Sequence, residues 1–94
     1  MPSIGLLTLH IYIPRAHSLK DKRQVLRGVK EKLRSRFNVS VAETGFQDAW
    51  QRSVLSVATV SEHHRLVEEV LQKVEATAAG LLGADLVSSE VELL

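Results

Sequence analysis

Apolar residues in this 94-residue chain follow two different spacings, and the order of these spacings leaves few folds open to it. Alternation or β-branched content is typical of strands, whereas apolar residues three and four positions apart are typical of one helix face. The pattern predicts strands over 4–13, 37–44, 52–61 and 84–93 and helices over 18–36 and 62–79. The order is therefore strand, helix, strand, strand, helix, strand, without an internal repeat.

This order is the split βαβ arrangement of ferredoxin-like folds. Right-handed crossovers that each skip one strand predict an antiparallel four-stranded sheet in the order 4-1-3-2, with both helices on one face. The first strand suits a central position, because Leu7 and Leu9 lie on one of its faces and Ile4 and Leu6 on the other. We therefore predict a single α+β domain over residues 1–94, a ferredoxin-like βαββαβ sandwich.

The helix boundaries have local signals. Ser18 is a good N-cap for the first helix, Ser61 is predicted to cap the second, and Gly80 and Gly83 are natural stop signals after it. The third strand is ambiguous by periodicity, and we expect Leu55 and Val57 to point inward.

Composition excludes several classes of protein. With 45% apolar and 24% charged residues, the chain is too apolar for intrinsic disorder. The absence of cysteine excludes a disulfide framework, a thiolate nucleophile and a Cys-ligated zinc site. The apolar run 4–13 is too short to span a bilayer, and no basic region of a signal peptide precedes it. We expect a cytoplasmic protein without a membrane partner.

Basic residues are concentrated in one part of the chain. Residues 15–36 hold nine basic side chains against two acidic ones, a net of +7, although the whole chain carries a formal net charge of only +1. Five of them fall within about 80° of one another on a helical wheel and form a stripe about 20 Å long. These five are Lys20, Arg23, Arg27, Lys30 and Arg34. The basic stripe predicts contact with the phosphates of RNA or of a ribosomal subunit.

A plainer interpretation of the basic stripe stays open. Its charges would then belong to a solvated surface and pair with Glu68, Glu69 and Glu75 of the second helix.

The sheet face away from the helices is the second candidate surface. We expect it to carry Thr8, His10, Tyr12, Ser40 and Ala42, with Ser56 and Ala58 as further candidates. Only Tyr12 and His10 resemble the base-stacking residues of an RNA-binding sheet, and the third strand offers none. The face therefore favours a packing surface for a second subunit, and a homodimeric interaction module is the alternative function.

The loop before the third strand contains the only tryptophan, Trp50. Because a lone Trp in a small domain is costly to expose, we expect it to cover the end of the core while Asp48 caps the turn. The alternative is that Trp50 anchors a partner, since Trp and Arg are enriched at binding hot spots.

Catalytic and metal-binding motifs are missing. The histidines at 10, 17, 63 and 64 have no spacing that converges on a metal, and there is no nucleophile elbow, phosphate-binding glycine loop or acid/base pair. We therefore predict no enzyme, no metal and no cofactor. A phosphate-ligand site formed by His17, Ser18 and Arg52 is a minor alternative.

Three blocks of sequence carry a family resemblance: 17–23 (HSLKDKR), 37–43 (FNVSVAE) and 48–52 (DAWQR). With these blocks the chain resembles the YlxP-like family of small bacterial proteins, a domain of unknown function. The resemblance implies a ferredoxin-like fold. Because members are often encoded among translation and ribosome-maturation factors, it also implies association with RNA or the ribosome. It supplies no catalytic residues.

Overall fold

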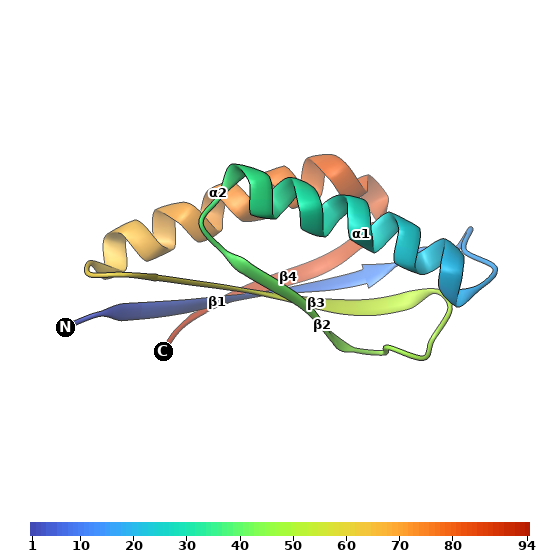
Figure 1. Ribbon diagram of the computed structural model, residues 1–94, viewed down its shortest axis with the longest axis horizontal. Coiled ribbons are helices and arrows are strands. Elements are labelled where there is room, and N and C mark those ends of the chain that lie inside the picture. Colours follow the sequence, from blue (N-terminus) through green and yellow to red (C-terminus); the bar gives the residue numbers. More distant parts are fainter.

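The computed structural model describes residues 1–94, and its elements follow the predicted order. They are β1 (Ser3–Tyr12), α1 (Leu19–Arg36), β2 (Ser40–Gly45), β3 (Arg52–Ser61), α2 (His64–Leu82), a short 3-10 turn (Gly83–Asp85) and β4 (Leu86–Leu93). The strands form one antiparallel sheet in the order β2-β3-β1-β4, which is the predicted order read from the opposite edge. Both helices lie on one face of this sheet and leave the other face uncovered (Figure 1). The ferredoxin-like α+β fold is confirmed.

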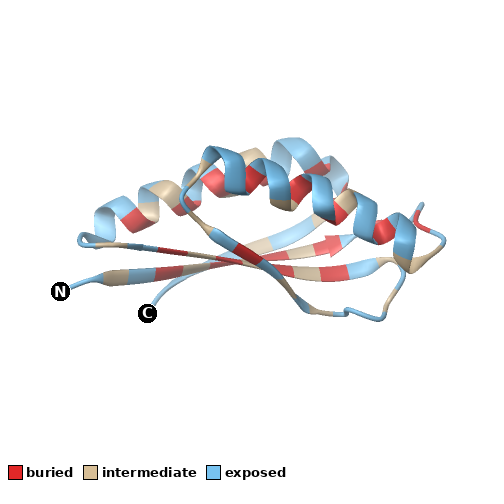
Figure 2. Cartoon of the chain, in the orientation of Figure 1, coloured by how far each residue is buried: buried red, intermediate tan, exposed pale blue.

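The core fills the space between the helices and the sheet. A single cluster of 16 buried apolar side chains forms it. Leu7 and Leu9 of the central strand β1 are fully buried, and so are Leu55 and Val57 of β3, which confirms the inward face predicted for the third strand. Figure 2 shows buried segments along the central strands and exposed segments on the outer sides of both helices.

The first helix begins where the sequence predicts. Ser18 has an extended backbone, and its hydroxyl accepts a hydrogen bond from the Asp21 backbone N–H at 3.0 Å. The Asp21 carboxylate in turn accepts from the backbone N–H of His17 at 3.0 Å. The first bond satisfies a donor that the helix itself leaves without a partner, and the second ties the residue before the N-cap to the first turn, so together they fix the start of the helix at Leu19.

The second helix differs from the prediction at both ends. Ser61 does not cap it, because β3 continues to Ser61, which pairs with Ser3 of β1. The helix starts two residues later, at His64, without a side-chain cap. It also continues through Gly80, which is exposed, and ends at Gly83, whose positive φ of 56° is easy only for glycine.

The second strand is shorter than predicted. It begins at Ser40 because Phe37 belongs to the end of α1, where its backbone N–H donates to the Leu33 carbonyl at 3.0 Å. Phe37 and Val39 are nevertheless partly buried and pack against the core, so the predicted alternation holds for burial.

The uncovered face carries the residues assigned to it. Thr8 pairs with Ser56 across β1 and β3, and Ala42 pairs with the same Ser56 across β2 and β3. Ser40 pairs with Ala58 in the same way. These residues alternate along their strands with the buried ones, so they point away from the helices.

Candidate functional site

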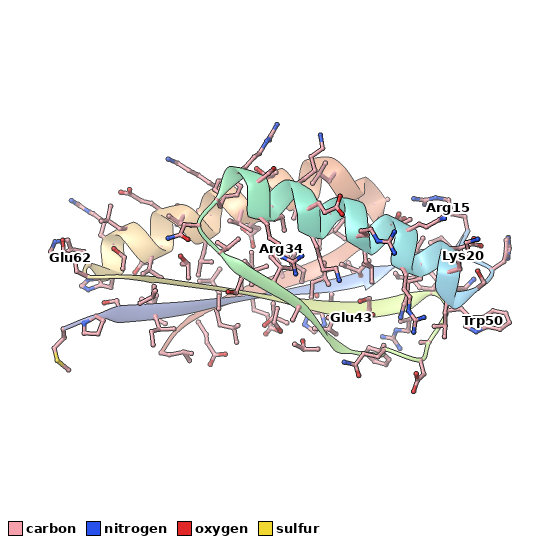
Figure 3. The ribbon with its side chains drawn as sticks, viewed as in Figure 1. Arg15, Lys20, Arg34, Glu43, Trp50 and Glu62 are labelled. Atoms are coloured by element: carbon pink, nitrogen blue, oxygen red, sulfur yellow. The ribbon has the colours of Figure 1, made fainter.

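The basic stripe lies on the side of α1 that overhangs the edge strand β2. Lys20, Arg23, Arg27 and Arg34 are exposed and Lys30 is half-buried. Arg34 reaches the sheet edge, where its Nη2 donates to the Val41 carbonyl at 2.7 Å (Figure 3). The stripe therefore follows the junction between helix and sheet and is not a band on the top of the molecule.

Part of this junction is hollowed. A shallow depression of about 200 Å³ lies between α1 and β2. It is lined by Arg23, Leu26, Arg27, Lys30 and Glu43. Three basic side chains thus converge on one concave surface.

The stripe is not neutralised within the molecule. None of its five residues forms an ion pair, and all four ion pairs of the protein lie elsewhere. The predicted alternative of pairing with the second helix is wrong, because Glu75 accepts a hydrogen bond from Ser89 of β4 and neither Glu68 nor Glu69 forms an ion pair. The charge of the stripe is therefore available to a ligand.

Next to the stripe, α1 also carries a lysine that is completely buried. Lys22 has 0% of its surface exposed, and its Nζ lies 3.0 Å from Oε2 of Glu43 on β2. Its Nζ also donates to three backbone carbonyls, of Phe46 at 2.8 Å, Arg52 at 3.1 Å and Gln47 at 3.3 Å. One ammonium group thus ties α1 to β2 and to both ends of the loop that joins β2 to β3.

The carboxylate partner of Lys22 is itself held in place. The hydroxyl of Ser53 donates to Glu43 Oε2 at 2.7 Å. No buried side-chain nitrogen or oxygen atom in the protein lacks a hydrogen-bond partner. We call Lys22, Glu43 and Ser53 the buried triad.

Sequence reasoning missed the buried triad, although a signal was present. Lys22 continues the three-four spacing of the apolar stripe formed by Leu19, Leu26, Val29 and Leu33, so it had to face the core. Glu43 follows Val41 at a spacing of two, and Ser53 precedes Leu55 at the same spacing. Since a lysine is almost never fully buried unless it is paired, a lysine inside an apolar periodicity indicates a buried partner.

The loop anchored by Lys22 has an unusual backbone. Phe46 has a φ of +57°, which is rare for a bulky side chain. Its carbonyl accepts hydrogen bonds from Lys22 and from the Ala49 backbone N–H, the latter at 3.0 Å. The guanidinium carbon of Arg52 lies 4.5 Å from the centre of the Phe46 ring, within cation–π range.

On the uncovered sheet face, this loop closes one side of a hollow of about 330 Å³. The hollow is lined by His10, Ile11, Tyr12, Phe46, Arg52, Ser53 and Val87. Tyr12 pairs directly with Arg52 across β1 and β3, and His10 Nε2 lies 2.7 Å from a carboxylate oxygen of Glu90. The structure thus brings the predicted residues Tyr12 and His10 together, and adds Phe46 and Arg52. We call this depression the aromatic hollow.

The prediction that Trp50 covers the core is wrong. Trp50 is 58% exposed, and its side chain projects outward from the end of the molecule at which Lys20 also lies (Figure 3). The next residue, Gln51, turns inward instead, and its side-chain amide donates to the carbonyls of Pro14 and Ala16. Asp48 is exposed, and the turn is closed by the backbone bond at Ala49.

Two other predicted contacts differ from expectation. The backbone N–H of His17 and the hydroxyl of Ser18 are both engaged with Asp21, whose carboxylate lies at the start of α1 where an anion would have to bind. The guanidinium of Arg52 stacks on the Phe46 ring instead of joining His17 and Ser18. The three residues of the phosphate-ligand alternative therefore do not form one site.

One ion pair at the surface joins two connecting segments of the fold. Arg15 Nη2 lies 2.8 Å from Asp85 Oδ2 and links the β1–α1 connection to the 3-10 turn. The hydrogen bond to Asp85 and its negative charge raise the pKa of Arg15 above its ordinary value.

The structure holds no group of three or more His, Asp or Glu side chains arranged to bind a metal ion. Neither α1 nor α2 combines the length and the apolar character needed to cross a membrane.

Comparison with solved structures defines the class of fold. A dimeric ferredoxin-like protein of unknown function from Thermobifida fusca YX superposes with a TM-score of 0.58 at 12% identity, covering 99% of this chain and 90% of that one. The designed protein Foldit4 gives 0.57 at 13% identity, covering 100% and 94%. A C-terminal segment of the alpha subunit of aIF2 from Pyrococcus abyssi gives 0.55 at 16% identity, covering 100% and 51%. At such identities the likeness shows the ferredoxin-like fold alone.

Comparison of sequences defines the family. Residues 4–91 match the family described as Protein of unknown function (DUF503), and the chain belongs to it. It is 41% identical over 73 residues to the uncharacterized protein YlxP of Bacillus subtilis (strain 168), covering 78% of this chain and 79% of the relative. The predicted membership of the YlxP-like family is confirmed.

Proposed function

We propose that this protein is a cytoplasmic, non-enzymatic module that associates with RNA or a ribosomal subunit through the basic stripe of α1. The observation that carries the proposal is that five basic side chains line one side of α1, four of them beside β2, without a single ion pair inside the protein. Charges without ion-pair partners attract a polyanion without first breaking an ion pair inside the protein.

Such a surface would bind RNA through contacts with its phosphates. Each neutralised phosphate releases counterions, so affinity falls as salt rises, and the contact positions the protein without reading base sequence. The depression between α1 and β2 concentrates Arg23, Arg27 and Lys30 on one concave surface, and the charge of Glu43 beside them is balanced by Lys22. The family resemblance implies a genomic setting among translation factors. This setting points to structured ribosomal RNA as the first ligand to test.

Filter binding to ribosomal RNA over a range of salt concentrations tests the proposal. The test variant replaces Lys20, Arg23 and Arg27 with Gln, and all three are exposed. The matched control replaces three other exposed basic residues with Gln, namely Lys32, Arg65 and Lys73. Both variants lose the same charge, so only a specific role of the stripe separates them. Loss of binding in the test variant alone supports the proposal, and equal loss in both variants contradicts it.

A second candidate is a homodimer that pairs through the uncovered sheet face. Exposed apolar side chains on this face favour it, among them Ile4 at 45%, Tyr12 at 44% and Val60 at 58% exposure. The Thermobifida fusca protein with the same fold is described as dimeric. Light scattering of the wild type and of Tyr12→Asp tests the candidate. A dimer mass that Tyr12→Asp leaves unchanged rules out this face as the interface.

A further inference from the structure

We infer that the aromatic hollow is a stacking site for one unpaired base of a single-stranded RNA segment whose phosphates lie on the basic stripe. The inference rests on the proposed function and extends it, because it assigns a ligand class to a second surface. The stripe alone would bind any phosphate backbone, whereas a stacking site requires a base that is not paired.

Aromatic exposure at the hollow is the first observation. The chain has only four aromatic residues, Tyr12, Phe37, Phe46 and Trp50, and all but Phe37 are exposed. Tyr12 at 44% and Phe46 at 49% exposure both line the aromatic hollow. Its volume of about 330 Å³ lies at the small end of the range for ligand pockets.

The chemistry of the lining suits a base more than an aliphatic ligand. Arg52 holds its guanidinium 4.5 Å from the Phe46 ring, so a cation and two aromatic rings border one depression. Aromatic rings and guanidinium planes are the surfaces on which proteins stack single-stranded bases. The phenol of Tyr12 adds a hydrogen-bonding group at the same place, and the imidazole of His10 beside it is engaged with Glu90 through its Nε2.

The backbone of Phe46 is the second, independent observation. Glycine adopts a φ of +57° without strain, whereas a phenylalanine there is held against a backbone preference. The restraint comes from Lys22, which is fully buried and donates to the Phe46 carbonyl. The backbone that carries the ring is therefore anchored in advance by a hydrogen bond from a buried side chain.

The buried triad also connects the two surfaces. Glu43 lines the depression of the basic stripe, and Ser53, which donates to it, lines the aromatic hollow. Lys22, which holds the loop, is the neighbour in sequence of Arg23 of the stripe. Because the stripe and the hollow lie on opposite sides of the sheet, an RNA strand with phosphates on α1 would have to pass around the edge formed by β2 and its loop.

Fluorescence anisotropy with two RNA probes tests the inference. One probe is a single strand of about 12 nucleotides, within the usual site size, and the other has the same length and phosphates but abasic central positions. We expect the wild type to bind the complete strand about 5- to 160-fold more tightly, the effect of one stacked base. Phe46→Ala and Tyr12→Ala should each reduce this preference while the affinity for the abasic strand stays unchanged. Leu81→Ala, at an exposed apolar residue of α2, is the control that should keep it.

The outcomes separate the inference from the proposed function. Equal affinity of the wild type for both strands overturns the inference and leaves the phosphate contact standing. The same conclusion follows if folded Phe46→Ala and Tyr12→Ala proteins retain the preference. Absence of binding to either strand overturns both. A dimer that Tyr12→Ala dissociates assigns the hollow to a subunit interface and also overturns the inference. Melting curves of each variant establish that it is folded.

Discussion

At the scale of single residues, Lys22 has the most unusual environment, because its side chain is charged and yet buried. It is fully buried and satisfied by Glu43 and three backbone carbonyls. Removing one partner of such a contact leaves the other charge buried without compensation, which typically costs about 3–5 kcal/mol. We therefore expect Lys22→Met to lower the free energy of unfolding by about that amount in urea denaturation. A loss below about 1 kcal/mol would contradict the assigned network.

The double variant Lys22→Met with Glu43→Leu refines this prediction. It removes the uncompensated carboxylate, but the carbonyls of Phe46, Gln47 and Arg52 still lose the bond from Lys22, and the Ser53 hydroxyl loses its acceptor. We expect it to recover part of the stability, so the two changes should not be additive. Strict additivity of the two free-energy losses would show that Lys22 and Glu43 do not interact.

Trp50 carries the second prediction at this scale. Since 58% of the side chain is exposed, Trp50→Ala should change the free energy of unfolding by about 0.5 kcal/mol, as at other surface positions. The wild-type protein should also show the red-shifted fluorescence of an exposed indole. A loss of about 3–5 kcal/mol together with blue-shifted emission would mean that Trp50 is part of the core after all.

At the scale of elements, two glycines test how closely the helices pack. A Cβ atom at Gly5 of β1 would lie 2.4 Å from Val67 Cγ1 and 2.7 Å from Leu71 Cδ1, both on α2. Gly5→Ala should therefore push α2 from the sheet and cost about 1–3 kcal/mol. At Gly28 of α1 nothing lies within 4 Å, so Gly28→Ala should stabilise the protein by about 1 kcal/mol. Melting temperatures that shift in the same direction would contradict this packing.

The elements also show what the sequence alone could predict. Local signals predicted the start of α1, because Ser18 and Asp21 act within one turn. The start of α2 depended on a distant event, the pairing of Ser61 with Ser3, which no local pattern contains. The basic stripe was predictable as a consequence of helical geometry alone.

The aromatic hollow was only half predictable. Strand alternation placed His10 and Tyr12 on the uncovered face, and the structure confirms that placement. Phe46 and Arg52 join them through a loop whose path is set by the buried triad, and loops have no periodicity from which to predict an orientation. For the same reason Trp50 was placed in the core by its size and not by any pattern.

At the scale of the whole molecule, positive charge is concentrated in one segment of the chain. Residues 15–36 carry +7, most of it on α1, while the sequence as a whole carries only +1. The molecule measures 45 × 21 × 20 Å, so a stripe of about 20 Å covers nearly half of its long axis. Such a separation of charge orients the protein as it approaches a polyanion, with α1 foremost.

The most direct measurement is the slope of log Kobs against log salt concentration for ribosomal RNA binding. For about four or five phosphate contacts the wild type should give a slope near −3 to −4. Replacing Lys20, Arg23 and Arg27 with Gln should make the slope about 2 to 3 units less steep, whereas the off-stripe variant of Lys32, Arg65 and Lys73 should keep the wild-type slope. Binding that does not depend on salt, or equal slopes for the two variants, would contradict the assignment of the basic stripe as the RNA-binding surface.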